Sequence, residues 1–183
     1  QSSGCEPLIV DFSNTSFGSV SCLWDFGSAG TSTDCSGPSI SYSVGSYDVS
    51  LTITDANGCV NTLDSLNMIN SFAYPSADFS FGPQPTTVLN ANIEFTNLSY
   101  GGSQYMWDFS GLDQSPAYEG SYTFPDTGVY VVELLVTSAE GCADSISYPL
   151  VIGPELLVYT PNAFTPDGDS KNDVFMPSVL GYV

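Results

Sequence analysis

Apolar and polar residues alternate along several short segments of the chain, and this alternation predicts β-strands. In residues 47–53, tyrosine, valine, leucine and isoleucine take every second position and polar residues lie between them. This is the pattern of a strand with one buried and one wet face. Residues 130–136 keep the same inward positions, and residues 63–69 and 144–152 follow turn sequences as return strands. Because no window shows a convincing helical stripe, the chain is predicted to be all-β.

The same blocks of sequence occur twice, and the same interval separates the members of each pair. The pairs are FSNTS at 12–16 with FTNLS at 95–99, WDFG at 24–27 with WDFS at 107–110, and the segments ending at Cys59 and Cys142. We call this common interval, which leads from Trp24 to Trp107, the repeat interval. It is too long for a solenoid repeat of roughly 20 to 50 residues and suits a small domain. We predict two tandem Ig-like β-sandwiches at residues 1–72 and 73–153, and the beginning of a third β domain at 154–183.

Neither end of the chain coincides with the boundary of a complete repeat or domain. The second copy opens with an alternating strand at residues 77–81. Its counterpart would lie before Gln1, so the first repeat is expected to lack its first strand. The last segment stops at Val183 in mid-pattern. We expect both ends to be cut from a longer polypeptide.

The net charge of the chain limits the classes of partner that it is expected to bind. One lysine and no histidine stand against 20 acidic residues, which gives a formal net charge of −19. Such a chain repels phosphate and anionic lipid, so nucleic acid and membrane surfaces are not expected as partners. No apolar run approaches the roughly 20 residues that span a bilayer. Charged residues are only 11% of the chain, and the surface is therefore expected to be rich in serine, threonine and asparagine, as in secreted proteins.

The five cysteines predict two disulfides. One repeat interval further along the chain, Cys22 and Cys35 are replaced by two tyrosines, so one touching pair replaces another, and we predict the bridge Cys22–Cys35. By exclusion, Cys5 is predicted to pair with Cys59, which leaves Cys142 without a partner in the chain. The alternative is that all five are reduced thiols in the core. Disulfides persist in a periplasm or outside the cell.

Few residues offer chemistry. Trp24 and Trp107 lie in the middle of predicted strands, where a large aromatic side chain normally fills the core. Asp25 and Asp108 follow them and are expected to anchor turns by accepting backbone N–H bonds. Asn14 and Asn97 lie in Asn-x-Ser sequons, and the same turn role is preferred for both.

The residue types and motifs of the sequence argue against catalysis. The chain has no histidine, its only basic residue is Lys171, and neither a nucleophile motif nor a phosphate-binding loop occurs. No pair of carboxylates is picked out for glycoside cleavage. We therefore expect a protein that is not an enzyme and needs no cofactor.

One segment has a spacing that suits a metal ion. Asp167, Asp169 and Asp173 occupy positions one, three and seven of a loop, a spacing that can bring oxygen ligands together on Ca²⁺. Lys171 takes position five, where calcium loops have an oxygen ligand. A tight turn with solvated carboxylates is therefore the preferred interpretation, and a calcium site is the alternative.

The two repeats resemble polycystic-kidney-disease (PKD) domains. The family pattern is Trp-Asp-Phe-Gly, then a tyrosine, a Gly-x-Tyr and an alternating strand. The matching residues are Trp24, Asp25, Phe26, Gly27, Tyr42, Gly45 and Tyr47 in the first copy, and Trp107, Asp108, Phe109, Gly128 and Tyr130 in the second. The resemblance implies PKD-like β-sandwiches that act as spacer or adhesive modules. The turn after the phenylalanine departs from the family in both copies.

The last segment resembles the opening of the gliding-motility-associated, type B C-terminal sorting domain of type IX secretion cargo. That opening has a Pro-Asn-Ala-Phe-Thr-Pro run, an acidic glycine turn, and an Asn-Asp before two apolar residues. The matching residues are Pro161, Asn162, Phe164, Thr165, Pro166, Asp167, Gly168, Asp169, Asn172, Asp173 and Phe175. Ser170 replaces the usual glycine. The resemblance implies export through the periplasm to the cell surface or the medium.

Three classes of function follow from these resemblances. The preferred one is a noncatalytic segment of a secreted or cell-surface, adhesin-like protein, with the type IX translocon and outer-membrane surface proteins as partners. The second is an accessory region of a secreted glycosidase or protease, which a catalytic domain upstream of Gln1 would establish. The third is a carbohydrate-binding module for extracellular glycans. It needs an exposed row of aromatic residues, for which Tyr100, Tyr105 and Tyr118 are the candidates.

Overall fold

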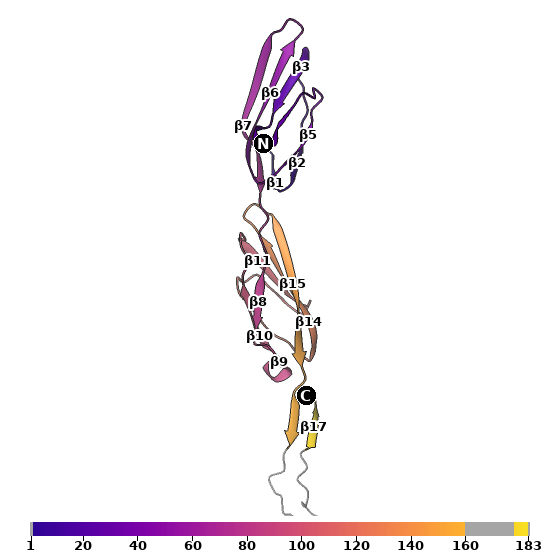
Figure 1. The fold of residues 1–183 in the computed structure, drawn as a ribbon. Coiled ribbons are helices and arrows are strands. Elements are labelled where there is room, and N and C mark those ends of the chain that lie inside the picture. The colour runs from indigo at the N-terminus through magenta and orange to yellow at the C-terminus, as the bar shows by residue number, and fades with distance from the viewer. Residues whose placement is uncertain (1, 160–177, 183) are drawn as a thin grey trace, which may run out of the picture. The chain divides into compact units, whose positions relative to one another are not determined.

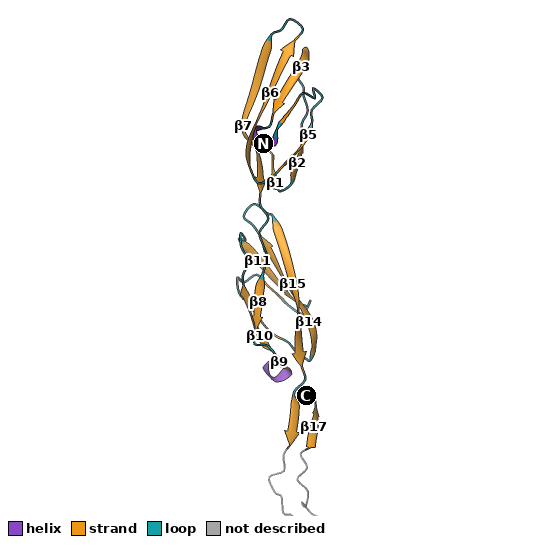
Figure 2. Ribbon diagram, in the orientation of Figure 1, coloured by secondary structure: helices purple, strands orange, loops and turns teal. Residues whose placement is uncertain are grey.

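The computed structural model describes residues 2–159 and 178–182, with side chains as far as Glu155. These residues form strands, turns and two short 3₁₀ segments (Figures 1 and 2). The chain divides into two compact units. Unit 1 contains residues 1–77, 99–105 and 135–145, and unit 2 contains residues 78–98, 106–134 and 146–183. The predicted all-β class is confirmed.

The first repeat consists of two sheets. Its strands are β1 (Ser2–Cys5), β2 (Leu8–Asp11), β3 (Ser19–Asp25), β4 (Thr31–Ser32), β5 (Ser39–Tyr42), β6 (Gly45–Asp55) and β7 (Val60–Phe72), with a 3₁₀ turn at Gly27–Ala29. Five of them form a sheet in the order β1-β7-β6-β3-β4, and β2 pairs with β5 in a separate sheet of two strands. Strand β1 runs parallel to β7, whereas the pairs β3–β6, β6–β7 and β2–β5 are antiparallel.

The alternation in the sequence explains how these sheets pack. Along β6, Tyr47, Val49 and Leu51 are buried and the polar residues between them are more exposed. Trp24 and Phe26 of the neighbouring segment join the same core, against which the apolar residues of β2 and β5 pack. The first repeat is therefore a β-sandwich, as predicted.

The second repeat has the same plan with one more strand in its smaller sheet. Its strands are β8 (Phe79–Gly82), β9 (Thr86–Thr87), β10 (Asn92–Asn97), β11 (Gln104–Phe109), β12 (Gln114–Ser115), β13 (Gly120–Thr123), β14 (Gly128–Thr137) and β15 (Ala143–Gly153), with a 3₁₀ turn at Val88–Asn90. One sheet has the order β12-β11-β14-β15-β9, and the other has the order β13-β10-β8. Strand β10 is therefore paired on both sides.

Aromatic rings fill the core of the second repeat within unit 2. Phe79, Phe95, Trp107 and Phe109 are each at most 3% exposed. The ring centroids of Phe79 and Trp107 are 5.1 Å apart, and those of Phe95 and Trp107 are 5.6 Å apart. These contacts join β8 and β10 of one sheet to β11 of the other.

Beyond the second repeat, β16 (Leu156–Tyr159) and β17 (Ser178–Tyr182) form an antiparallel pair. The predicted sorting motif at residues 161–175 lies outside the described residues. Asp167, Asp169 and Asp173 of the predicted acidic turn or calcium loop lie outside them as well. These interpretations stay predictions from the sequence.

Of the two predicted disulfides, one is present in the structure and the other is not. Cys22 is bonded to Cys35, as predicted, whereas Cys5 is bonded to Cys142 across a sequence separation of 137 residues. Both Cys5 and Cys142 lie in unit 1. Cys59 is free and exposed. The predicted bridge Cys5–Cys59 and the predicted free thiol of Cys142 are therefore wrong.

The length of β7 explains this correction. Cys59 directly precedes the first residue of β7, while Cys5 pairs with Phe72 at the last. A strand of 13 residues spans roughly 40 Å, whereas bridged cysteines have Cα atoms within about 7 Å. The Cα atoms of Cys5 and Cys142 are 5.6 Å apart. A bridge from one repeat to the other is not visible when equivalent positions of the two repeats are compared.

Candidate functional site

The two tryptophans are part of the core, the position predicted for them. Trp24 is 6% exposed and Trp107 is fully buried. Each indole N–H donates to a backbone carbonyl ten residues further on, at 3.0 Å: Trp24 to Asp34 and Trp107 to Ala117. A buried indole whose N–H is satisfied in this way stabilises the fold. It does not offer a stacking surface for a sugar.

The aspartates after the tryptophans anchor turns, as expected. Asp25 Oδ1 accepts a hydrogen bond from the Gly27 N–H at 2.8 Å, and Asp108 Oδ1 accepts one from the Gly111 N–H at 2.6 Å. The side chain of Gln114 also donates to Asp108. The hydrogen bonds from Gln114 and then Gly111 lower the pKa of Asp108, because they favour the charged carboxylate.

Two further aspartates of the first repeat have the same role. Asp55 Oδ1 accepts the N–H groups of Asn57 and Cys59, both at 2.8 Å. The backbone hydrogen bond from Cys59 is the main cause that lowers the pKa of Asp55. Hydrogen bonds from the Ser36 side chain and backbone lower the pKa of Asp34. These carboxylates are ionised acceptors inside turns, and none has the raised pKa of a general acid.

The two sequon asparagines take different roles. Asn14 Oδ1 accepts the N–H of Ser16 at 2.9 Å, which is the turn role expected for it. Asn97 is 5% exposed, lies at the end of β10, and donates from its side chain to the carbonyl of Tyr118. Its side chain joins the end of β10 to the loop before β13, so the predicted turn role holds for Asn14 alone.

The three tyrosines proposed for glycan binding are not equivalent. Tyr100 is 84% exposed and Tyr118 is 52% exposed. The hydroxyl of the half-buried Tyr105 donates to the carbonyl of Gly102 at 3.0 Å. Tyr100 and Tyr105 belong to unit 1, and Tyr118 belongs to unit 2. A flat binding row made of these three residues stays a prediction.

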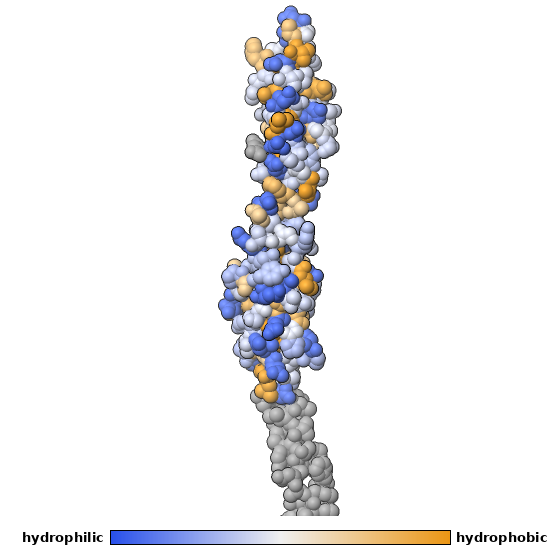
Figure 3. All heavy atoms as spheres, turned by 90° about the vertical axis from the view of Figure 1, so that its left-hand side faces the viewer, coloured by the Kyte–Doolittle hydropathy of each residue, from blue (hydrophilic) through white to orange (hydrophobic). Residues whose placement is uncertain are grey.

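Other apolar side chains are exposed singly. Val60, Leu63 and Leu66 of β7 are 64%, 68% and 75% exposed. On the face seen in Figure 3, hydrophobic residues form separate patches among hydrophilic ones. Scattered exposed apolar residues are ordinary on protein surfaces.

Within residues 2–155, no group of three or more acidic, cysteine or histidine side chains is close enough to hold a metal ion. In the same part of the chain, none of the helical segments has the length and the apolar composition needed to cross a bilayer.

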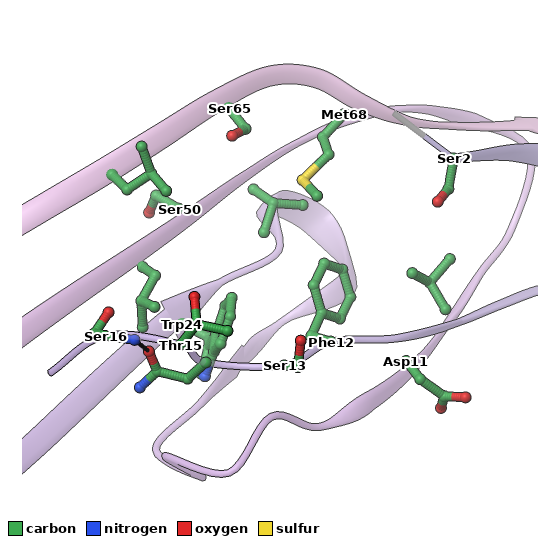
Figure 4. A pocket seen from close by; sticks show the side chains of 15 residues that line it. Ser2, Asp11, Phe12, Ser13, Thr15, Ser16, Trp24, Ser50, Ser65 and Met68 are labelled. Carbon is green, nitrogen blue, oxygen red and sulfur yellow. Dashed lines mark hydrogen bonds between the residues drawn. The ribbon is translucent and has the colours of Figure 1, made fainter.

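One hollow of the first repeat lies between its two sheets. It has a volume of about 310 Å³, and residues of both sheets line it. The apolar part of the lining comes from Val10, Phe12, Trp24, Val49, Leu51, Leu63 and Met68. Figure 4 shows the Phe12 and Trp24 rings on one side of this space and Met68 on the other. We call this hollow the groove.

The groove exposes side chains that a sandwich normally covers. Val10 and Phe12 pack against the core cluster but are only partly buried. Their counterparts in the second repeat, Ile93 and Phe95, are 0% and 1% exposed. The sequence indicated this difference only indirectly, because the first repeat was expected to lack a first strand. It did not indicate a groove lined by the Phe12 and Trp24 rings.

Comparisons with known proteins find similarity among solved structures only. No protein-family model matches the chain, and no curated protein matches it. The PKD1 domain of Vibrio anguillarum Epp is 23% identical over 44% of this chain and 94% of that one, with a TM-score of 0.39. The PKD1 domain of the Vibrio cholerae metalloprotease PrtV has the same identity, TM-score and share of this chain, and 98% of that chain is covered.

Fibronectin(III)-like modules of Clostridium thermocellum CbhA are 13% identical over 82% of this chain and 87% of that one, with a TM-score of 0.42. These likenesses lie among β-sandwich modules. Because the TM-scores are below 0.5, the fold described above rests on the strand pairing and the core of this chain itself.

Proposed function

We propose that the chain is a noncatalytic segment of a secreted or cell-surface protein, in which the tandem sandwiches serve as spacer or adhesive modules. The observation that carries this proposal is the pair of disulfides, Cys5–Cys142 and Cys22–Cys35. Bridges of this kind persist in oxidising compartments and are reduced in a cytosol. The hydrogen bonds that Asp25 and Asp108 accept inside turns support a structural rather than a catalytic use of these acidic residues.

The Cys5–Cys142 bridge supports the spacer role in particular. It joins the start of the first repeat to a turn of the second by a second covalent connection in addition to the chain. Closing a loop of this size removes conformational entropy from the unfolded chain, worth about 5 kcal/mol in the entropic estimate. A spacer that must resist unfolding outside the cell benefits from such a link.

We propose further that residues 154–183 begin a sorting domain through which the type IX machinery exports the protein. The support is the motif between Pro161 and Phe175 in the sequence. Partners under this proposal are the translocon and outer-membrane surface proteins, and the route passes through the periplasm.

The test is protease accessibility on intact cells, compared between a normal strain and one whose type IX translocon is inactivated. Digestion of the protein only in the normal strain is expected, with a cytosolic protein as the control for lysis. Non-reducing peptide mapping of the exported protein should recover Cys5–Cys142 and Cys22–Cys35. Equal digestion in both strains contradicts the export route, and recovery of reduced Cys22 and Cys35 contradicts the extracellular location.

A further inference from the structure

The turn that ends at Cys59 and the turn that ends at Cys142 occupy equivalent positions, one repeat interval apart. In the first turn, the N–H of Asp55 donates to the carbonyl of Cys59 at 3.0 Å, and the Asp55 side chain accepts the N–H of Cys59. In the second turn, Ser138 makes the same two hydrogen bonds with Cys142. Each cysteine directly precedes the first residue of a long strand, β7 or β15. The two turns therefore hold their cysteines in matching places.

The glycine before each cysteine completes the match. Gly58 has a φ of 83° and Gly141 has a φ of 89°. Each of them donates its backbone N–H at 3.1 Å to the carbonyl of the residue three positions earlier. Because glycine adopts a positive φ at little cost, the local sequence favours this turn in both repeats. The two turns thus present their cysteines in the same way to a neighbouring segment.

In the second repeat, this position forms a covalent bond with another repeat. Cys142 is bonded to Cys5, the last residue of β1, which pairs with Phe72 at the end of β7. The sulfur of Cys142 also lies 4.0 Å from the carbonyl oxygen of Phe72, and Cys142 is 1% exposed. All three residues belong to unit 1. At this turn, a sandwich is therefore bonded to the strand end of the repeat that precedes it.

Cys59 occupies the same position in the first repeat, and its thiol is free and exposed. The other cysteines of the chain form the bridges Cys5–Cys142 and Cys22–Cys35. The length of β7 also separates Cys59 from Cys5. A disulfide at Cys59 therefore requires a cysteine that lies outside residues 1–183.

We propose that Cys59 is a covalent docking site, which forms a disulfide with a cysteine of a further β-sandwich repeat outside residues 1–183. The partner cysteine lies at the end of an edge strand that runs parallel to a long strand, the place of Cys5 in β1. The bond that Cys142 makes at the equivalent position carries this inference. The chemistry is the same whether that repeat belongs to this protein or to another polypeptide. The inference rests on the oxidising compartment of the proposed function.

The bond forms by thiol–disulfide exchange with an oxidant that carries a reactive disulfide. The thiolate of Cys59 attacks this disulfide, which gives a mixed disulfide and releases one thiolate of the oxidant. The thiolate of the partner cysteine then attacks the Cys59 sulfur of the mixed disulfide and releases the oxidant as a dithiol. The two protein thiols together lose two protons and two electrons, which the oxidant gains. The first attack needs an accessible thiol, and the thiol of Cys59 is exposed.

The experiment is disulfide mapping of the full-length protein, which is isolated from cells without reductant and alkylated at once to trap free thiols. Cleavage before aspartate places Cys59 in the peptide of residues 55–63, apart from the other cysteines. We expect this peptide to be linked to a cysteine peptide from outside residues 1–183, and reduction should separate the two. On a non-reducing gel, a link within the protein leaves a monomer, whereas a link to another polypeptide gives a larger complex. The gel therefore distinguishes the two sources of the partner.

A pair of matched variants isolates the role of the thiol. Cys59→Ser should abolish the linked peptide completely and leave the partner cysteine alkylated. Val60→Ser, at the adjacent residue that is 64% exposed, should leave the link unchanged. Both variants should retain the Cys22–Cys35 bridge, which serves as the control for folding and for an oxidising compartment.

An extended chain tests the geometry without an unknown partner. A copy of residues 1–83 that carries Cys59→Ser is placed ahead of Gln1 in the whole chain. The added Cys5 is then separated from the original Cys59 by 137 residues, as Cys5 is from Cys142. After refolding in a glutathione redox buffer, we expect these two cysteines to be bonded and an alkylating reagent to label neither. In the chain without the added copy, the same reagent should label Cys59.

Several outcomes would overturn the inference. One is recovery of alkylated Cys59 from the full-length protein while Cys22 and Cys35 are bonded. Others are a bond between the Cys59 residues of two copies, and a Cys59 that carries only a small thiol such as glutathione. Labelling of both cysteines in the extended chain, with each Cys22–Cys35 bridge intact, would contradict the geometry. Reduced Cys22 and Cys35 in the protein from cells would contradict the proposed function itself, and this inference with it.

Discussion

Residues 12–14 and 95–97 have almost the same sequence, Phe-Ser-Asn and Phe-Thr-Asn, but different structures. Phe95 and Asn97 are buried, paired residues of β10. Phe12 and Asn14 are half-buried and belong to no strand. Because the local sequence is matched, the difference must come from the neighbour: β8 lies beside β10, and no described strand lies beside residues 12–14.

The comparison shows that strand formation here depends on pairing. The aromatic core around Phe12 and Trp24 keeps the geometry of its counterpart without that neighbour. Packing across the sandwich is thus set by Trp24, Phe26 and the β6 residues, and the missing strand affects mainly the edge.

The largest effect is expected from the bridge that reaches both repeats. Replacing Cys5 and Cys142 by alanine should lower the free energy of unfolding by about 5 kcal/mol, and replacing Cys22 and Cys35 by about 3 kcal/mol, because the second loop is shorter. Urea denaturation under non-reducing conditions measures both. Cys59→Ser, at the exposed free thiol, is the control and should change stability by less than about 0.5 kcal/mol. Equal losses for the two bridges would contradict the loop-length argument.

The next change removes the ring by which β8 packs in the core of the second repeat. Phe79→Ala removes the ring that packs on Trp107 and Tyr148 and should cost about 3 to 5 kcal/mol. The exposed Ser80→Ala on the same strand is the matched control. Guanidinium denaturation gives the loss, and the amide signals of residues 95–97 should then exchange faster with solvent. A loss below about 1 kcal/mol would mean that β8 contributes little to the second core.

A smaller contrast compares one position in the two repeats. Ile93 is fully buried between paired strands, while Val10 faces the groove and is half-buried. Ile93→Ala should cost about 2 to 4 kcal/mol and Val10→Ala about 1 kcal/mol, because a cavity next to an open groove is already accessible to water. Thermal unfolding of both variants at the same pH checks the order. The reverse order would show that the groove is closed in solution.

The smallest effect is expected for Tyr42, a core residue of the first sandwich. Tyr42 is fully buried, its hydroxyl has no hydrogen-bond partner within residues 2–155, and burial raises its pKa to about 12. The pKa of Tyr42 is therefore higher in the folded state than in the unfolded state, where it is near 10. Its contribution to the free energy of unfolding is fully present below pH 10 and is lost as the pH rises towards 12.

Tyr42→Phe should therefore leave stability at pH 7 unchanged or raise it by up to about 1 kcal/mol, since a buried hydroxyl without a partner contributes no bond. It should also remove this residue's share of the loss of stability between pH 10 and 12. Parallel denaturation series of the wild type and the variant at pH 7, 10 and 12 measure both effects. A clear loss of stability at pH 7 would indicate a hydrogen bond at this hydroxyl in solution.

The local sequence pattern was sufficient to predict several features of the structure. The period-two alternation of residues 47–53 placed β6 and its buried face, and the constant repeat interval related the two cores through Trp24 and Trp107. The replacement of Cys22 and Cys35 by a pair of tyrosines identified one bridge. Each of these features can be recognised by comparing a residue with the one two positions away or with its equivalent in the other repeat.

Only the tertiary structure decided the partner of Cys5 and the state of the β2 edge. Pairing of Cys5 depends on which end of a 13-residue strand each cysteine occupies, and that position is set by the parallel register of β1 with β7. The edge depends on whether another strand lies beside it, as the matched segments 12–14 and 95–97 demonstrate. Sequence determines which face of a strand is apolar, because alternation is a local property. Pairing and register join distant residues, so they were decided by the fold.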